Sequence, residues 1–234
     1  MNTLLADTLS RSDTWLGHGI TGNHDENALP TGFAELDTVL HGGGLPLGGC
    51  IEYLSDSNGL GSMGLFLPVM EALSQENRWM MFIAPPHTPY APLLEARQID
   101  SSKILLVHPR NRANLLWCIE QALSSGTCSS VFAWLGNDSY RYRELHKLQL
   151  AASRSDTLSV LFRPQRAANS SAPASLRLQS RAYREIHVLK QRGGPQHINV
   201  TLSSKNDKPH QPQLWELPSW PPQEQAANDY PCAV

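Results

Sequence analysis

An apolar run passes into a glycine-rich turn at residues 49–64, which read Gly-Cys-Ile-Glu-Tyr-Leu-Ser-Asp-Ser-Asn-Gly-Leu-Gly-Ser-Met-Gly. The first six residues have the length and apolar character of a buried strand, and the turn has the small residues of a strand-to-helix connection. Leu65, Val69 and Leu73 then follow at helical spacing, with Pro68 acceptable only in the first helical turn. The stretch therefore predicts a strand, a tight turn and a helix, which is the building unit of a parallel sheet.

The same alternation continues on the C-terminal side of this unit. Apolar runs of strand length lie at residues 79–84, 103–108, 130–135 and 158–163. Segments with helical spacing lie between them, at residues 115–123, where Gly126 can cap the helix, and at residues 145–152. Strands that alternate with helices predict an α/β fold with a mostly parallel central sheet flanked by helices.

Two further patterns indicate where this domain ends. Residues 164–175 are rich in Ala, Ser, Asn and Pro, which predicts a mobile loop. Residues 185–190 and 197–202 alternate in polarity on either side of Arg192-Gly-Gly-Pro195, which predicts a C-terminal β-hairpin. We expect an N-terminal arm at residues 1–28, one α/β domain at residues 29–202 and a flexible tail at residues 203–234.

Composition limits the classes of function. A chain of 234 residues suits one domain with short arms, and its net charge of −2 argues against nucleic-acid binding through overall charge. The charge is uneven, because residues 141–192 contain eleven basic and three acidic residues. The four cysteines have no C-x-x-C spacing, and no long apolar run predicts a signal peptide or a membrane span. We therefore expect a cytoplasmic protein that does not bind membranes.

The segment before the first strand resembles the start of a RecA-like ATPase core, through residues 29–37, Leu-Pro-Thr-Gly-Phe-Ala-Glu-Leu-Asp, and 42–48, Gly-Gly-Gly-Leu-Pro-Leu-Gly. In that family the next turn binds phosphate, with a Lys on the outer phosphates and a Ser or Thr hydroxyl on Mg²⁺. The resemblance places the lysine position at Ser62 and the hydroxyl position at Met63. We therefore expect a RecA-like core with a degenerate phosphate loop, whose corresponding positions are Ser55, Gly59, Gly61, Ser62 and Met63. A plain strand-to-helix connection is the simpler interpretation, and a residual ATPase with a non-standard site is a further alternative.

Two other positions lack the groups that ATP hydrolysis needs. The resemblance puts Pro86 at the position of the catalytic glutamate, and the strand that would end in a Mg²⁺-positioning Asp ends in Trp134 and Leu135. His87 is a candidate base, but the sequence places no phosphate site or carboxylate beside it, so loop packing is the simpler interpretation. No histidine spacing matches a metal site. We expect no enzyme activity, no cofactor and no metal.

The run from Leu29 to Leu202 resembles ImuA, a RecA-related accessory protein of SOS-induced translesion DNA synthesis. Besides the two segments above, the shared motifs lie at residues 83–92, 122–126, 148–152, 161–164 and 188–195. The resemblance implies a non-catalytic subunit of an error-prone complex, whose partners are an ImuB-type inactive Y-family polymerase, a DnaE-type polymerase and, for some members, RecA. Residues 68–164 are also similar to the SulA cell-division inhibitors, which implies binding to FtsZ instead. The segments before and after this region favour ImuA.

RecA-like cores contact DNA through two loops, which the resemblance places at residues 136–143 and 163–177. Their candidate contacts with single-stranded DNA or an acidic partner are Arg141, Arg143, Arg163, Arg166 and Arg177, with Tyr140 and Tyr142 available for stacking. A solvated basic face is the alternative interpretation.

Two outlying features complete the set of candidates. Lys190 and Arg192 flank the hairpin turn, where they either contact a partner or protect a sheet edge from unwanted pairing. Trp15, in the N-terminal arm, either anchors the arm on a neighbouring subunit or packs on its own core.

Overall fold

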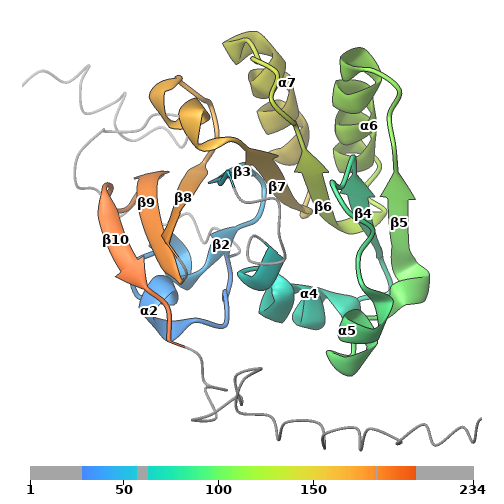
Figure 1. Cartoon of the computed structure of the whole chain (residues 1–234), viewed down its shortest axis with the longest axis horizontal. Helices are drawn as coiled ribbons and strands as arrows, with labels where there is room; N and C mark the ends of the chain where they lie inside the picture. The colour runs from blue at the N-terminus through green and yellow to red at the C-terminus, as the bar shows by residue number, and fades with distance from the viewer. Residues whose placement is uncertain (1–27, 57–62, 183, 204–234) are drawn as a thin grey trace, which may run out of the picture. The chain divides into compact units, whose positions relative to one another are not determined.

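A computed structural model of the chain describes residues 28–56, 63–182 and 184–203 (Figure 1). Within these ranges the predicted strands are confirmed, with small shifts at their ends. They are β3 (Cys50–Leu54), β4 (Trp79–Ile83), β5 (Ile104–Val107), β6 (Cys128–Trp134) and β7 (Leu158–Arg163). The predicted hairpin is also present, as β9 (Glu185–Gln191) and β10 (Ile198–Thr201), which pair antiparallel.

One eight-stranded sheet organises the fold, with the strand order β10-β9-β8-β3-β7-β6-β4-β5. The strands from β8 to β5 in this order run parallel, β9 pairs antiparallel with β8, and β10 pairs antiparallel with β9 at the edge. A second, two-stranded sheet joins β1 (Ala28–Leu29) to β2 (Leu45–Pro46). The predicted mixed α/β fold with a mostly parallel sheet is therefore confirmed.

Helices cover both faces of the large sheet. α4 (Leu67–Ser74) and α5 (Ala91–Ala96) lie on one face, and α6 (Arg112–Ser124) and α7 (Tyr142–Ala152) lie side by side on the other (Figure 1). Short helices α2 (Ala34–Asp37), η1 (His41–Gly43) and η2 (Ser101–Lys103) occur in the connections. Pro68 falls in the first turn of α4, as the sequence requires. Among the helices of the described residues, none has the length and apolar character to cross a membrane.

Alternating side chains of the strands divide the core into two layers. Under α4, the rings of Tyr53, Phe66, Phe132 and Phe162 meet edge to face or at a tilt, and all four are buried. Under α6 and α7, Ile119 and Leu148 pack on the opposite side of the same strands. This division explains why the central strands have nearly continuous apolar runs, because a parallel sheet is buried on both faces.

The segment after β7 differs from its prediction. Residues 164–175 were expected to form a mobile loop, but they include the 3₁₀ helix η3 (Gln165–Asn169) and bury Ala167, Ala172 and Ala174. The strand β8 (Leu176–Ala182), which no apolar run predicted, follows at once and pairs with β3. The loop prediction was wrong because η3 is held by Arg177, which donates to the Ala167 carbonyl, and β8 was missed because its polar residues have partners far away in the sequence.

Candidate functional site

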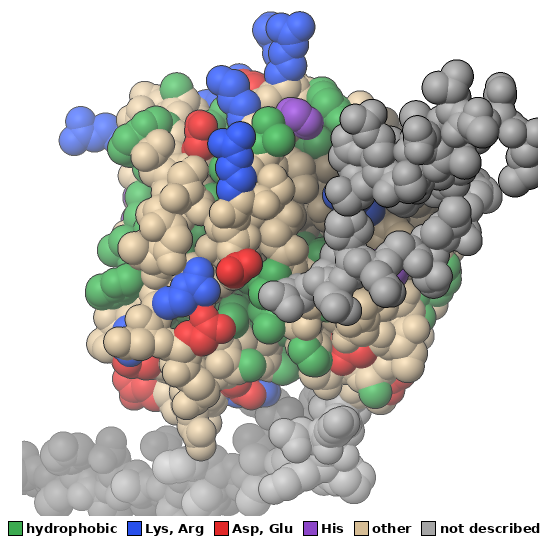
Figure 2. Space-filling model, turned by 180° about the vertical axis from the view of Figure 1, so that it is seen from behind, with side chains coloured by type: hydrophobic (Ala, Val, Ile, Leu, Met, Phe, Trp, Pro, Cys, Tyr) green, Lys and Arg blue, Asp and Glu red, His purple; other side chains and the backbone are tan. Residues whose placement is uncertain are grey.

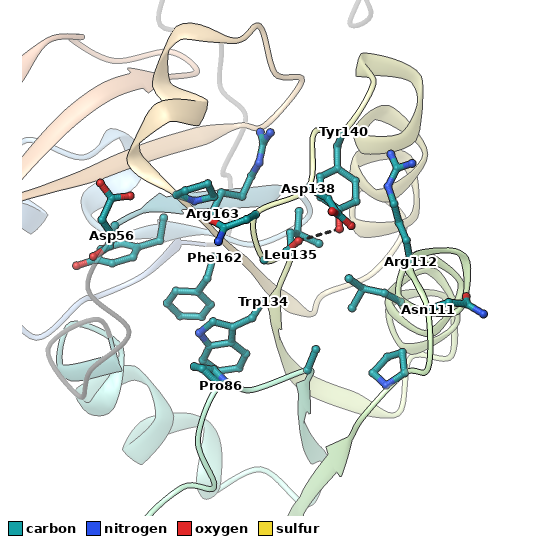
Figure 3. A pocket seen from close by; sticks show the side chains of 18 residues that line it. Asp56, Pro86, Asn111, Arg112, Trp134, Leu135, Asp138, Tyr140, Phe162 and Arg163 are labelled. Carbon is teal, nitrogen blue, oxygen red and sulfur yellow. Dashed lines mark hydrogen bonds between the residues drawn. The ribbon is translucent and has the colours of Figure 1, made fainter.

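A cavity of about 650 Å³ opens at the carboxyl ends of the parallel strands (Figure 3). Its walls come from the turns that follow five strands, with Ser55 and Asp56 after β3, Pro86 after β4, Pro109 and Asn111 after β5, residues 135–138 after β6 and Pro164 after β7. Open α/β sheets bind their ligands at this edge, where the turns of adjacent strands diverge. This cavity is therefore the candidate functional site.

The structure brings together positions that the resemblance to a RecA-like core singled out in separate parts of the sequence. Ser55, Pro86, Trp134 and Leu135 all line this one cavity. Met63, at the expected hydroxyl position, packs instead against the apolar core. Gly59, Gly61 and Ser62 lie outside the described residues. The described part of the phosphate-loop region thus presents an apolar side chain where a metal-binding hydroxyl would be needed.

Aromatic rings form the floor of the cavity. Trp134 stacks on Phe162 with a centroid distance of 4.5 Å and an interplanar angle of 8°, as Figure 3 shows. Phe82 meets Trp134 edge-on at 6.0 Å, and Tyr53 lies against Phe162. Trp134 lies at the strand end where the resemblance to RecA-like cores places a carboxylate. An indole in this position can pack against a ligand, but it can neither hold a metal nor accept a proton from water.

Polar groups line the rim, and most of them are bound to other parts of the protein. Asp56 accepts a hydrogen bond from the Gln165 backbone N–H at 2.8 Å, which joins the β3 turn to η3. Arg112 lies over the ring of Tyr140 at 4.7 Å and pairs with Glu144 at 2.5 Å. Tyr140 donates its hydroxyl to the Leu135 carbonyl at 2.8 Å. Burial raises the pKa of Tyr140, and the negative charge of Asp138 adds to the rise.

A buried charge cluster lies under one wall of the cavity. The carboxylate of Glu52, in the middle of β3, pairs with Arg163 of β7 and with Arg177 of β8, each at 2.8 Å. All three side chains are buried. Arg177 also donates to the carbonyl of Ala167 at 2.7 Å, so the cluster holds η3 against the sheet. Removing one member of such a cluster leaves a buried charge without its partner, which costs about 3–5 kcal/mol.

This cluster corrects two of the predicted contact residues. Arg163 and Arg177 were candidates for DNA or partner contact in a mobile loop, but they are buried in strands and neutralise Glu52. Lys190 has a related role, because its ammonium donates to the Ala172 carbonyl at 3.0 Å. Burial lowers the pKa of Lys190, and the nearby positive charge of Arg177 lowers it further.

The other predicted cations are exposed but do not gather at one place. Arg166 donates to the carbonyl of Asn137, which ties together the two loops predicted to contact DNA. Arg141 and Arg143 lie at the start of α7, and Arg192 lies in the loop between β9 and β10. Figure 2 shows Lys and Arg side chains as separate groups on the face that it presents, several of them near its upper edge. Trp15 lies outside the described residues.

Sequence reasoning did not single out Glu52, the residue on which the buried cluster depends. A signal was available, because Glu52 is the one charged residue in the apolar run at residues 50–54. A charged residue in a fully buried strand requires an opposite charge nearby. Its partners could not be named without the strand order.

Comparison with known proteins adds information on part of the chain. Residues 49–159 match the protein-family model described as cell division inhibitor SulA. This segment is SulA-like. It runs from the start of β3 to the start of β7 and therefore includes α4 to α7, while β1, β2 and β8 to β10 lie outside the match.

Individual SulA proteins show similarity over the same region. The cell division inhibitor SulA of Klebsiella aerogenes is 27% identical over 123 residues, which is 51% of this chain and 71% of that protein. SulA of Pectobacterium atrosepticum is 26% identical over 121 residues, with the same shares of the two chains. The crystal structure of SulA from Pseudomonas aeruginosa is matched at 29% identity with a TM-score of 0.39, over 49% of this chain and 97% of that one.

Proposed function

We propose that this protein is a SulA-like inhibitor of bacterial cell division that acts by binding another protein in the cytoplasm. The match of residues 49–159 to the SulA family model carries this proposal. It replaces the preference for ImuA drawn from sequence motifs, because the similarity to SulA is found in the family model and in several SulA proteins. FtsZ is the partner that the resemblance to SulA implies.

The chemistry of the cavity supports a binding function without catalysis. At the positions that would hold a metal-binding hydroxyl, a general base and a metal-positioning carboxylate, the chain has Met63, Pro86 and Trp134, of which Pro86 and Trp134 line the cavity. A core of RecA type that has lost these groups fits the mostly parallel sheet and its glycine-rich first turn. We therefore expect no nucleotide binding, and equilibrium titration with ATP at millimolar concentration should give no signal. Saturable binding would indicate a residual ATPase instead.

Cell length tests the proposed inhibition directly. Overproduction of the full chain should convert dividing cells into filaments, measured by microscopy as the distribution of cell lengths. In vitro, the purified chain should reduce the polymerisation of FtsZ, followed by light scattering. Phe132→Asp places a charge in the aromatic core and provides a matched unfolded control, which should leave cell length unchanged. Unchanged cell length on overproduction of the folded wild-type chain would contradict the proposal.

A second candidate function follows from the parts outside the SulA-like segment. β8, β9 and β10 are integral to the large sheet, and β1 and β2 form a second sheet, yet none of these strands lies in the family match. These additional elements favour an ImuA-type accessory subunit in translesion synthesis. The test is co-purification from DNA-damaged cells with an ImuB-type inactive polymerase, a DnaE-type polymerase or RecA. Absence of all three under damaging conditions would reject this candidate.

A further inference from the structure

The outer surfaces of α6 and α7 form a second groove, which shares Arg112 with the cavity at the carboxyl ends of the strands. The groove is lined on α6 by Ala113, Leu116, Trp117 and Glu120, and on α7 by Lys147 and Leu148, with the Arg112–Glu144 pair at one end. Residues 113, 117 and 120 follow helical spacing, so one face of α6 borders the groove along about two turns. Grooves between two helices of this kind can accept the ridge of a third helix.

A large apolar side chain is exposed in the lining of this groove. Trp117 of α6 is 61% exposed and lies next to Leu116, which is half-buried. An exposed Trp next to a groove is typical of a residue that anchors a protein partner.

The charge of this surface indicates the sign of the charge that a partner would carry. Arg143, Lys147 and Arg154 are exposed and follow a single stripe of α7 and its closing turn, at helical spacing with Leu150. Within the described part of the chain, these three cations form no ion pair. Glu144 is neutralised locally, because it accepts from Arg112 and from the Arg141 backbone N–H at 2.7 Å. The stripe is therefore positive and complementary to an acidic partner.

We propose that the groove between α6 and α7, together with the stripe Arg143–Lys147–Arg154, docks an acidic amphipathic helix of a protein partner. Apolar residues of that helix would cover Trp117 and Leu116, and its carboxylates would face the stripe. The groove contains apolar side chains from both helices, which favours a helix over a nucleic-acid strand. The inference extends the proposed function, on which it rests, by naming a docking surface and the kind of segment that it recognises.

A labelled peptide can test this docking with the full-length chain. The probe is a fluorescein-labelled helix of about 18 residues, or five turns, with apolar residues at i, i+3, i+4 and i+7 and glutamate beside them. Fluorescence anisotropy should show saturable binding that weakens between about 50 and 200 mM salt. The double variant R143E/K147E should bind about tenfold more weakly or worse, since two attractions become repulsions. Trp117→Ala should also weaken binding, without loss of folding because this side chain is exposed.

Matched controls separate specific docking from general charge attraction. The double variant R181E/R192E makes the same charge change at exposed residues of β8 and of the loop between β9 and β10, and should bind like wild type. A peptide with lysine in place of glutamate should not bind. Equal binding by R143E/K147E and wild type, or loss of binding in R181E/R192E, would overturn the proposal. Displacement of the peptide by a labelled thymidine strand of about 20 nucleotides at lower concentration would also overturn it, in favour of nucleic acid.

The cellular readout distinguishes this inference from the function on which it rests. If wild type causes filaments and R143E/K147E does not, while both fold equally by circular dichroism, the groove takes part in inhibition. If R143E/K147E binds the peptide like wild type and still causes filaments, the inference fails and the proposed inhibition stands. If wild type causes no filaments, the proposed inhibition fails, and the peptide titrations alone decide whether the groove docks an acidic helix.

Discussion

Two parts of one basic stretch of sequence differ in their exposure to solvent. Arg163 and Arg177 are buried on either side of Glu52, whereas Arg143 and Lys147 are exposed on α7. All four lie between residues 141 and 192, which the sequence marks as one basic region. Local charge in a sequence therefore does not measure the charge of a surface, because a single buried carboxylate can pair with cations from two strands and keep both away from solvent.

The largest expected effect comes from removing that carboxylate. Glu52→Gln should lower the free energy of unfolding by about 3–5 kcal/mol, because two buried guanidinium groups lose their counter-charge. Urea denaturation followed by circular dichroism measures the change. Glu185→Gln, at an exposed position of β9, is the control and should change stability by less than about 0.5 kcal/mol. If the two variants are equally stable, the cluster does not hold η3 and β8 in place.

A smaller effect should come from Lys190, which lies near the cluster and is only partly buried. Its folded pKa is lowered by burial, so the unfolded chain binds more protons than the folded chain at pH values just below the ordinary lysine pKa of 10.5. The free energy of unfolding of wild type, relative to Lys190→Met, should therefore rise with pH in that window. Paired urea titrations at neutral and alkaline pH measure this slope. Parallel pH profiles for the two proteins would show that Lys190 is not desolvated in the folded state.

The smallest effect on stability is expected from the exposed cations of α7. R143E/K147E should change the free energy of unfolding by less than about 0.5 kcal/mol, because exposed charges interact weakly through water. Thermal unfolding gives the value. The contrast with Glu52→Gln would establish that the buried cations stabilise the fold while the exposed ones remain available for binding. A large loss of stability in R143E/K147E would remove this contrast.

Much of the parallel sheet could be predicted because its central strands are buried on both faces. Phe132 and Val131 point to opposite layers, and each layer is apolar, so the run at residues 130–135 is visible without knowledge of its neighbours. β8 was not predicted because it has no continuous apolar run. Arg177 in that strand is compatible with burial only beside Glu52, and the two residues are 125 positions apart.

The sequence predicted which catalytic groups the candidate site lacks, but it did not predict the arrangement of the residues that line it. Ser55, Pro86 and Trp134 could each be compared with a RecA-like core, but their position around one cavity depends on the order of β3, β7, β6 and β4 in the sheet. The stacking of Trp134 on Phe162 likewise joins neighbouring strands that lie apart in sequence.

The sequence by itself determined the alternation of strands and helices, the C-terminal hairpin and the absence of a lysine after Gly61, because these depend on local periodicity and residue type. Only the tertiary structure decided which basic residues are buried with Glu52 and which remain exposed on α7. The physical reason is that the free energy of a charge depends on its solvent and its neighbours, and both are set by strand order and helix packing.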